Sequence, residues 1–151
     1  GLSGSRKPRR PDKEDGIRRS QRLLLTWLIE TPALFEKIEG IITADDFVEN
    51  LYHQVAQMVF DGHREGNLNP AAILSRFIND EDQYKEVAAL FNASLKESLN
   101  NEEQKKAFSE TVMKVRKNSL DVASRNAKDI TQLQEIIRQQ AALKQLHISL
   151  D

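Results

Sequence analysis

The chain has 151 residues, the length of one ordinary domain or of two small ones. Hydrophobic residues make up 39% of it and charged residues 30%, and the formal net charge is −1, which is a globular profile. Cysteine is absent, which excludes disulfides, thiolate metal sites and cysteine nucleophiles. The 6 glycines and 4 prolines are few, and strand-like alternation of β-branched residues is missing, so we predict an all-α fold.

The longest apolar runs cover residues 23–25 and 27–29, far short of the roughly 20 residues that a membrane-spanning helix needs. No signal-peptide pattern opens the chain. We therefore expect a cytoplasmic protein that has no membrane partner.

The small net charge hides an uneven distribution along the chain. Residues 1–19 carry a formal charge of +4, residues 20–100 carry −7 and residues 101–151 carry +2. The basic, proline-containing start predicts a flexible basic linker over residues 1–16, and a solvated linker is favoured over a nucleic-acid-binding arm because no aromatic residue is present to stack bases. Since an acidic globule repels phosphate, we expect no strong direct nucleic-acid binding.

The first helix is predicted from residue 17 to about residue 30. Leu24, Trp27 and Leu28 recur at helical spacing, and their apolar neighbours widen the stripe, so this helix should be buried on several sides. The pair Thr31-Pro32 ends it, and Pro32 can start a short helix over residues 33–39.

Three further helix starts are predicted before residue 95. Thr43, with Asp46 three residues later, predicts a capped helix that runs on to about residue 65. The pair Asn69-Pro70 predicts a short helix, and Asn79 or Asp80 can cap the next one.

The pattern of apolar residues changes after residue 95. Asn100 or Asn101 can cap a long helix that runs to about residue 126, and Asp129 can cap a last helix. Both helices have narrower apolar stripes than those before them. We therefore predict a flexible linker (residues 1–16), a helical bundle subdomain (17–97) and a subdomain with a long helix and a C-terminal helical hairpin (98–151).

Residue patterns typical of catalysis are scarce. The 3 histidines lack metal-ligand spacing, and no phosphate loop, nucleophile elbow or dinucleotide fingerprint occurs. The pair Asp45-Asp46 is best interpreted as a helix start, and the basic group Lys114, Arg116 and Lys117 as a solvated face. We expect no enzyme activity, metal or cofactor in this chain.

Several segments resemble the C-terminal domain of bacterial DnaG-type primases. The resemblance rests on residues 18–35 (RRSQRLLLTWLIETPALF), 42–47 (ITADDF), 51–60 (LYHQVAQMVF) and 129–137 (DITQLQEII), within 18–147. These are hydrophobic patterns and not invariant chemical residues. The N-terminal domain of replicative DnaB-type helicases has a similar opening and remains the alternative, although the basic linker over residues 1–16 and the terminal hairpin suit the primase domain better.

The resemblance implies a module that binds the replicative hexameric DNA helicase, recruits primase to the bacterial replication fork and modulates helicase activity. Primer synthesis by a DNA-directed RNA polymerase, with its zinc and magnesium, would then belong to other parts of the parent protein. A single-strand DNA-binding protein is a further candidate partner. An alternative role, under the helicase resemblance, is self-association together with primase binding.

The last helix is the predicted place of the helicase contact. A two-helix hairpin buries little by itself, so part of its apolar stripe should await a partner. The candidate partner-binding residues are Ile136, Ile137, Gln140, Leu143, Lys144 and Leu146. The alternative is that these side chains only close the core of the hairpin.

Overall fold

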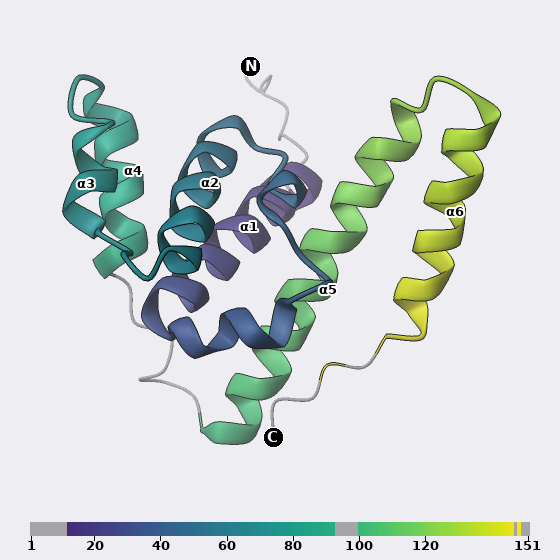
Figure 1. Cartoon of the computed structure of the whole chain (residues 1–151), viewed down its shortest axis with the longest axis horizontal. Helices are drawn as coiled ribbons and strands as arrows, with labels where there is room; N and C mark the ends of the chain where they lie inside the picture. The colour runs from purple at the N-terminus through teal and green to yellow at the C-terminus, as the bar shows by residue number, and fades with distance from the viewer. Residues whose placement is uncertain (1–11, 93–99, 147, 149–151) are drawn as a thin grey trace, which may run out of the picture.

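A computed structural model describes residues 12–92, 100–146 and 148 of the chain, with side chains from residue 16 onward. This part is all-α and contains no strand, so the predicted fold class is confirmed (Figure 1). None of its helices combines the length and the apolar character that a membrane span requires. The elements are α1 (Asp12–Glu30), η1 (Pro32–Ile38), η2 (Ala44–Asp46), α2 (Asn50–Arg64), α3 (Pro70–Ser75), α4 (Glu81–Asn92), α5 (Asn101–Arg125) and α6 (Ile130–Lys144), where η marks a 3-10 helix.

Helix α1 lies at the centre of the bundle and packs against α2, α4, α5 and η1. Its residues Leu24, Leu25 and Leu28 are fully buried, as the wide apolar stripe predicts. Helices α3 and α4 lie at one end of the molecule, α6 lies at the other, and α5 runs diagonally between the bundle and α6 (Figure 1). The bundle is thus built around one helix that is apolar on most of its sides.

The first half of α5 belongs to the core of the bundle. Phe108, Val112 and Val115 are buried in the same cluster as the side chains of α1 and α2. The ring of Phe108 meets that of Trp27 edge to face, with centroids 6.0 Å apart and planes at 78°. The buried core therefore does not stop at residue 97, and the division into 17–97 and 98–151 stays a prediction about folding units.

The beginning of α1 corrects the predicted linker. We expected residues 1–16 to be flexible, but the helix begins at Asp12, so residues 12–16 belong to it. Gly16 costs helical stability, yet one unfavourable residue is outweighed when tertiary contacts hold the helix that follows. Residues 1–11 lie outside the described part of the chain.

The long helix predicted from Thr43 is interrupted. The capping box of Thr43 and Asp46 is present, but it closes only the short turn η2, and α2 begins at Asn50. Between them, Phe47 adopts extended backbone and places its ring fully inside the core. The backbone N–H of Glu49 donates to Oε1 of Gln21 on α1, at 3.0 Å. The hydrogen bond from Glu49 to Gln21 and the burial of Phe47 thus take the place of the helical hydrogen bonds that the local sequence would allow.

The other predicted caps are confirmed. Asn69 accepts from the backbone N–H of Ala72, and Asp80 accepts from that of Gln83. Asn100 forms a reciprocal capping box with Glu103, and Asp129 accepts from the N–H of Gln132. These starts are encoded within about four residues of chain, which is why the sequence is sufficient to find them.

Candidate functional site

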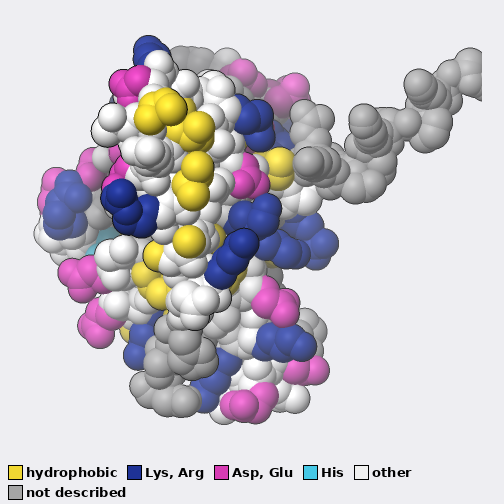
Figure 2. All heavy atoms as spheres, turned by 90° about the vertical axis from the view of Figure 1, so that its right-hand side faces the viewer, with side chains coloured by type: hydrophobic (Ala, Val, Ile, Leu, Met, Phe, Trp, Pro, Cys, Tyr) yellow, Lys and Arg dark blue, Asp and Glu magenta, His cyan; other side chains and the backbone are white. Residues whose placement is uncertain are grey.

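Helix α6 is the least buried of the long helices. It packs chiefly on α5, and none of its described residues is buried. Ile130 is 67% exposed and Ile137 is 52% exposed, although both are large and apolar. Figure 2 shows this end of the molecule, where hydrophobic side chains follow one another along α6. Such a row of exposed apolar side chains is unusual on a surface that only meets water.

The structure distributes the predicted partner-binding residues over different sides of α6. Ile137 and Lys144 are exposed, whereas Ile136, Gln140, Leu143 and Leu146 are half-buried. Leu143 and Leu146 also line a small crevice beside Gly40 and Ile41 of the bundle. The structure therefore brings some of the candidates against neighbouring elements and leaves Ile137 on the outside.

A groove lies between α5 and the C-terminal half of α6. Its volume is about 410 Å³, and Met113 and Leu143 provide its apolar walls. Three of the predicted residues line it, namely Gln140, Leu143 and Lys144, together with Met113, Lys114, Lys117 and Asp121 of α5. The groove is the place where the sequence-predicted residues and α5 form a common surface.

The two walls of this groove are linked by one carboxylate. Asp121 on α5 accepts from Nε2 of Gln140 on α6 at 3.2 Å, and from Nζ of Lys117 at 3.0 Å. Lys114 and Lys144 have no carboxylate partner among the residues that the structure describes. With three lysines and one aspartate, the groove has a local formal charge of +2.

A polar network connects the bundle to α6 through α5. Nη1 of Arg116 donates to Oδ1 of Asp46 at 2.7 Å, and its Nη2 donates to Oε1 of Gln139 at 3.1 Å. The other carboxylate oxygen of Asp46 accepts from the backbone N–H of Thr43 at 2.8 Å. The Asp46 side chain is only 4% exposed, so its charge depends on these partners. We call Asp46, Arg116 and Gln139 the joint, because they tie three elements together.

A second polar cluster lies entirely within the bundle. Arg18 on α1 forms ion pairs with Glu49 and with Glu86, and its guanidinium lies 5.0 Å from the ring centroid of Tyr52. The Tyr52 hydroxyl donates to Glu86, and burial together with that hydrogen bond raises the pKa of Tyr52 well above its usual value. The cluster fastens α1, α2 and α4 to one another.

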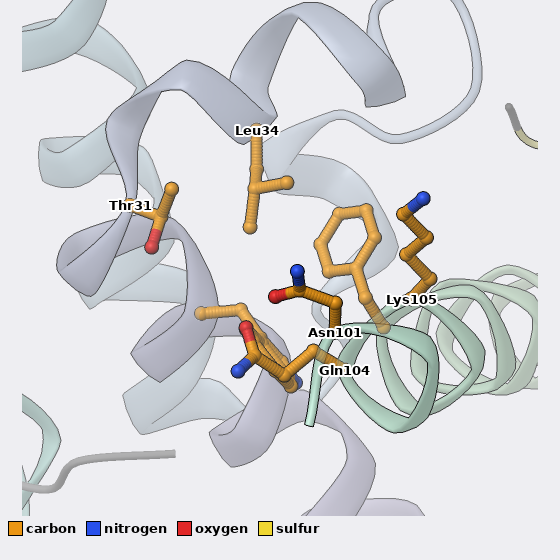
Figure 3. A pocket seen from close by; sticks show the side chains of 7 residues that line it. Thr31, Leu34, Asn101, Gln104 and Lys105 are labelled. Atoms are coloured by element: carbon orange, nitrogen blue, oxygen red, sulfur yellow. The ribbon is translucent and has the colours of Figure 1, made fainter. Parts of the chain in front are cut away.

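A smaller pocket lies where the end of α1 meets the start of α5 (Figure 3). Its volume is about 200 Å³, and its lining residues are Trp27, Thr31, Leu34, Asn101, Gln104, Lys105 and Phe108. The Oγ1 atom of Thr31 is buried there without a hydrogen-bond partner. Among the described residues of this lining there is no carboxylate and no imidazole.

The histidines of α2 serve packing and backbone contacts. Nδ1 of His53 lies 3.0 Å from the carbonyl oxygen of Ala44. The ring of His63 stacks on Phe35, with centroids 4.0 Å apart. Across the described residues, no three His, Asp or Glu side chains come together in a way that could hold a metal ion.

Comparison with known proteins identifies no relative of this chain. No family model matches it, and neither curated proteins nor solved structures provide a match. The residues and the geometry described above are therefore the observations that bear on function.

Sequence reasoning missed residues on both helices of the hairpin. Ile130 is the most exposed large apolar side chain of α6, but it stands at the helix start and away from the predicted group. Lys114 and Lys117, interpreted as part of a solvated face, line the groove. Arg116, assigned to the same face, reaches a buried aspartate 70 residues away in the chain. No residue pattern near Arg116 or near Asp46 predicts that pairing.

Proposed function

We propose that this chain is the helicase-binding module of a bacterial primase, and that α6 carries the principal contact. In this proposal it recruits primase to the replicative hexameric helicase at the fork and modulates the helicase. The resemblance of residues 18–35, 42–47, 51–60 and 129–137 to the primase C-terminal domain supplies the family. The observation that supports the site is the exposure of Ile130 and Ile137 on a helix without a buried residue.

Folding alone does not account for this surface. In an amphipathic helix the apolar side normally faces the core, since each fully buried large aliphatic side chain is worth about 1.5–3 kcal/mol. Ile130 and Ile137 lie seven residues apart, so they share one face of α6 and are separated by about 10 Å along the helix axis. A partner that covers this face would gain the apolar burial that the chain by itself leaves unused.

We assign no catalytic step to this chain and place primer synthesis, with its zinc and magnesium, in the rest of the parent primase. A single-strand DNA-binding protein is a second candidate partner, and the bacterial cytoplasm is the proposed location. Primer synthesis by this chain alone, assayed with nucleotides and a divalent metal, would contradict the assignment.

The decisive experiment measures binding of the whole chain to the replicative helicase of the same organism. The test variant carries Ile130→Ser and Ile137→Ser, and the matched control carries Ile78→Ser. Ile78 lies in the bundle and is 66% exposed, almost the same as the 67% of Ile130. We expect the double variant to bind roughly tenfold more weakly, as for loss of two interface anchors, and the control to bind as the unmodified chain does.

Binding by calorimetry and thermal unfolding by circular dichroism should be recorded for the same samples. Equal binding by the double variant would remove α6 from the contact. A stable homo-oligomer that ignores the helicase would instead favour the helicase N-terminal domain. Separate fragments 1–98 and 99–151 are poor reagents, because the cut removes Phe108 and its neighbours from the core.

A further inference from the structure

The groove between α5 and α6 has features that the proposed contact does not use. It is apolar inside, where Met113 and Leu143 face it, and its edges carry lysines from both helices. Lys114 extends from α5 and Lys144 from α6, and both are exposed. Figure 2 shows dark blue Lys and Arg side chains gathered beside the hydrophobic row of α6. A concave apolar surface with cations at its edge is suited to a ligand that is apolar and anionic at once.

We propose that this groove binds an acidic, partly apolar segment of the protein partner of α6. The inference rests on the proposed function, since it describes a second part of the same contact. An apolar side chain of that segment would lie between Met113 and Leu143. Carboxylates on either side of it would pair with Lys114 and Lys144.

The charges of the groove identify this occupant. Lys117 already pairs with Asp121 at 3.0 Å, so among the described residues the charges without a carboxylate partner are those of Lys114 and Lys144. Two cations held on opposite walls select a segment that has acidic groups at both edges. Among the described residues, no carboxylate of residues 12–92 lines this groove, so the proposed acidic groups come from the partner.

A nucleic acid fits these walls less well. Nucleic-acid grooves combine basic groups with aromatic side chains on which bases stack, and none of the described residues that line this groove is aromatic. Without a stacking surface among its described residues, the groove suits a protein segment better than a nucleic acid.

The test uses the whole chain and the replicative hexameric helicase as the probe. The groove variant carries Lys114→Glu and Lys144→Glu. The control carries Lys85→Glu and Lys106→Glu, which makes the same charge change at exposed positions on α4 and α5 outside the groove. We expect the groove variant to bind roughly tenfold more weakly at low salt, and the control to change less than about twofold, because reversed charges at an interface repel their former partners.

Salt and neutral substitutions add independent evidence. Affinity of the unmodified chain should fall as sodium chloride is raised from about 50 to 500 mM, and affinity of the groove variant should fall less. Lys114→Gln with Lys144→Gln should give an intermediate loss. Circular dichroism melts should coincide for all these variants, since every substituted lysine is exposed.

The outcomes separate this inference from the proposed function. Absence of helicase binding by the unmodified chain would overturn both. Binding that depends on Ile130 and Ile137 but is unchanged in the groove variant would overturn the groove alone. Tight binding of a single-stranded oligonucleotide that is lost in the groove variant, with helicase binding intact, would make the groove a nucleic-acid site. Concentration-dependent self-association lost in the same variant would make it a contact between copies of this chain.

Discussion

The bundle and the hairpin are built from the same kinds of residue, but they use them differently. In the bundle, α1 buries several leucines completely, and even its polar side chain Gln21 is only 1% exposed. In the hairpin, α6 buries no residue and leaves Ile130 and Ile137 in water. The bundle thus buries most of its large apolar side chains in its own core, although Ile78 remains 66% exposed. The hairpin leaves part of its apolar surface in contact with solvent, and this exposed part is the surface to which the proposed function assigns a partner.

The boundary between these regions runs through a helix and not through a loop. The N-terminal half of α5 contributes Phe108 and Val112 to the bundle core, while its C-terminal half forms one side of the hairpin. A continuous helix is stiff, so movement of the hairpin would require bending of α5 or loss of the joint. Four substitutions test this difference between the two regions.

The largest effect should come from Phe108→Ala. This ring is 1% exposed and contacts Trp27, so its removal should lower the free energy of unfolding by about 3–5 kcal/mol. Urea denaturation followed by Trp27 fluorescence measures the loss. If the bundle keeps its stability, α5 is not part of its core. Leu133→Ala on α6, which is half-buried on the hairpin, is the control and should cost distinctly less.

A smaller effect should follow from breaking the joint. Arg116→Met leaves the buried Asp46 carboxylate with the backbone N–H of Thr43 but without its cation, which should cost about 2 kcal/mol. Adding Asp46→Asn to that variant removes the uncompensated charge and should recover part of the loss. Thermal denaturation of the single and double variants measures this coupling.

The joint should also fix the position of α6 relative to the bundle. Gln139→Leu removes the α6 end of the network while the Arg116–Asp46 ion pair remains. If the joint holds α6 beside the bundle, this variant should show a broader distribution of distances between spin labels placed at Glu39 and Gln134. Both positions are exposed. An unchanged distance distribution would show that packing on α5 alone orients α6.

The smallest effect should come from Tyr52→Phe, which alters only the bundle. Loss of the hydrogen bond to Glu86 should cost about 1 kcal/mol at neutral pH and leave helicase binding unchanged. The folded-state pKa of Tyr52 is raised above its unfolded value, so unfolding releases a proton at high pH. The stability from this group is therefore complete below about pH 10 and is lost as pH rises above it.

Chemical denaturation between pH 8 and 11 can test the sign of this effect. The unmodified chain should lose stability over that range more steeply than the Tyr52→Phe variant does. Parallel curves would show that Tyr52 ionises equally well in the folded and unfolded chain.

The sequence by itself was sufficient for the features that are written into short stretches of chain. The all-α class, the cap at Asn100 and the restart at Asn69 depend on residues a few positions apart, so local patterns predicted them. Tertiary structure decided the features that depend on distant residues. Gln21 and the burial of Phe47 interrupt the helix expected after Thr43, because a buried ring and a distant acceptor outweigh local helix propensity.

The candidate site shows the same division. The apolar spacing on α6 predicted that this helix would carry unused surface, but it could not tell Ile137, which faces water, from Leu143, which faces α5 and the bundle. From the sequence, Arg116 was interpreted as part of a solvated basic face, but in the fold it pairs with Asp46. Local periodicity determines which residues share a side of a helix. Which side is covered, and which cation finds a buried carboxylate, depends on elements that meet only when the whole chain packs.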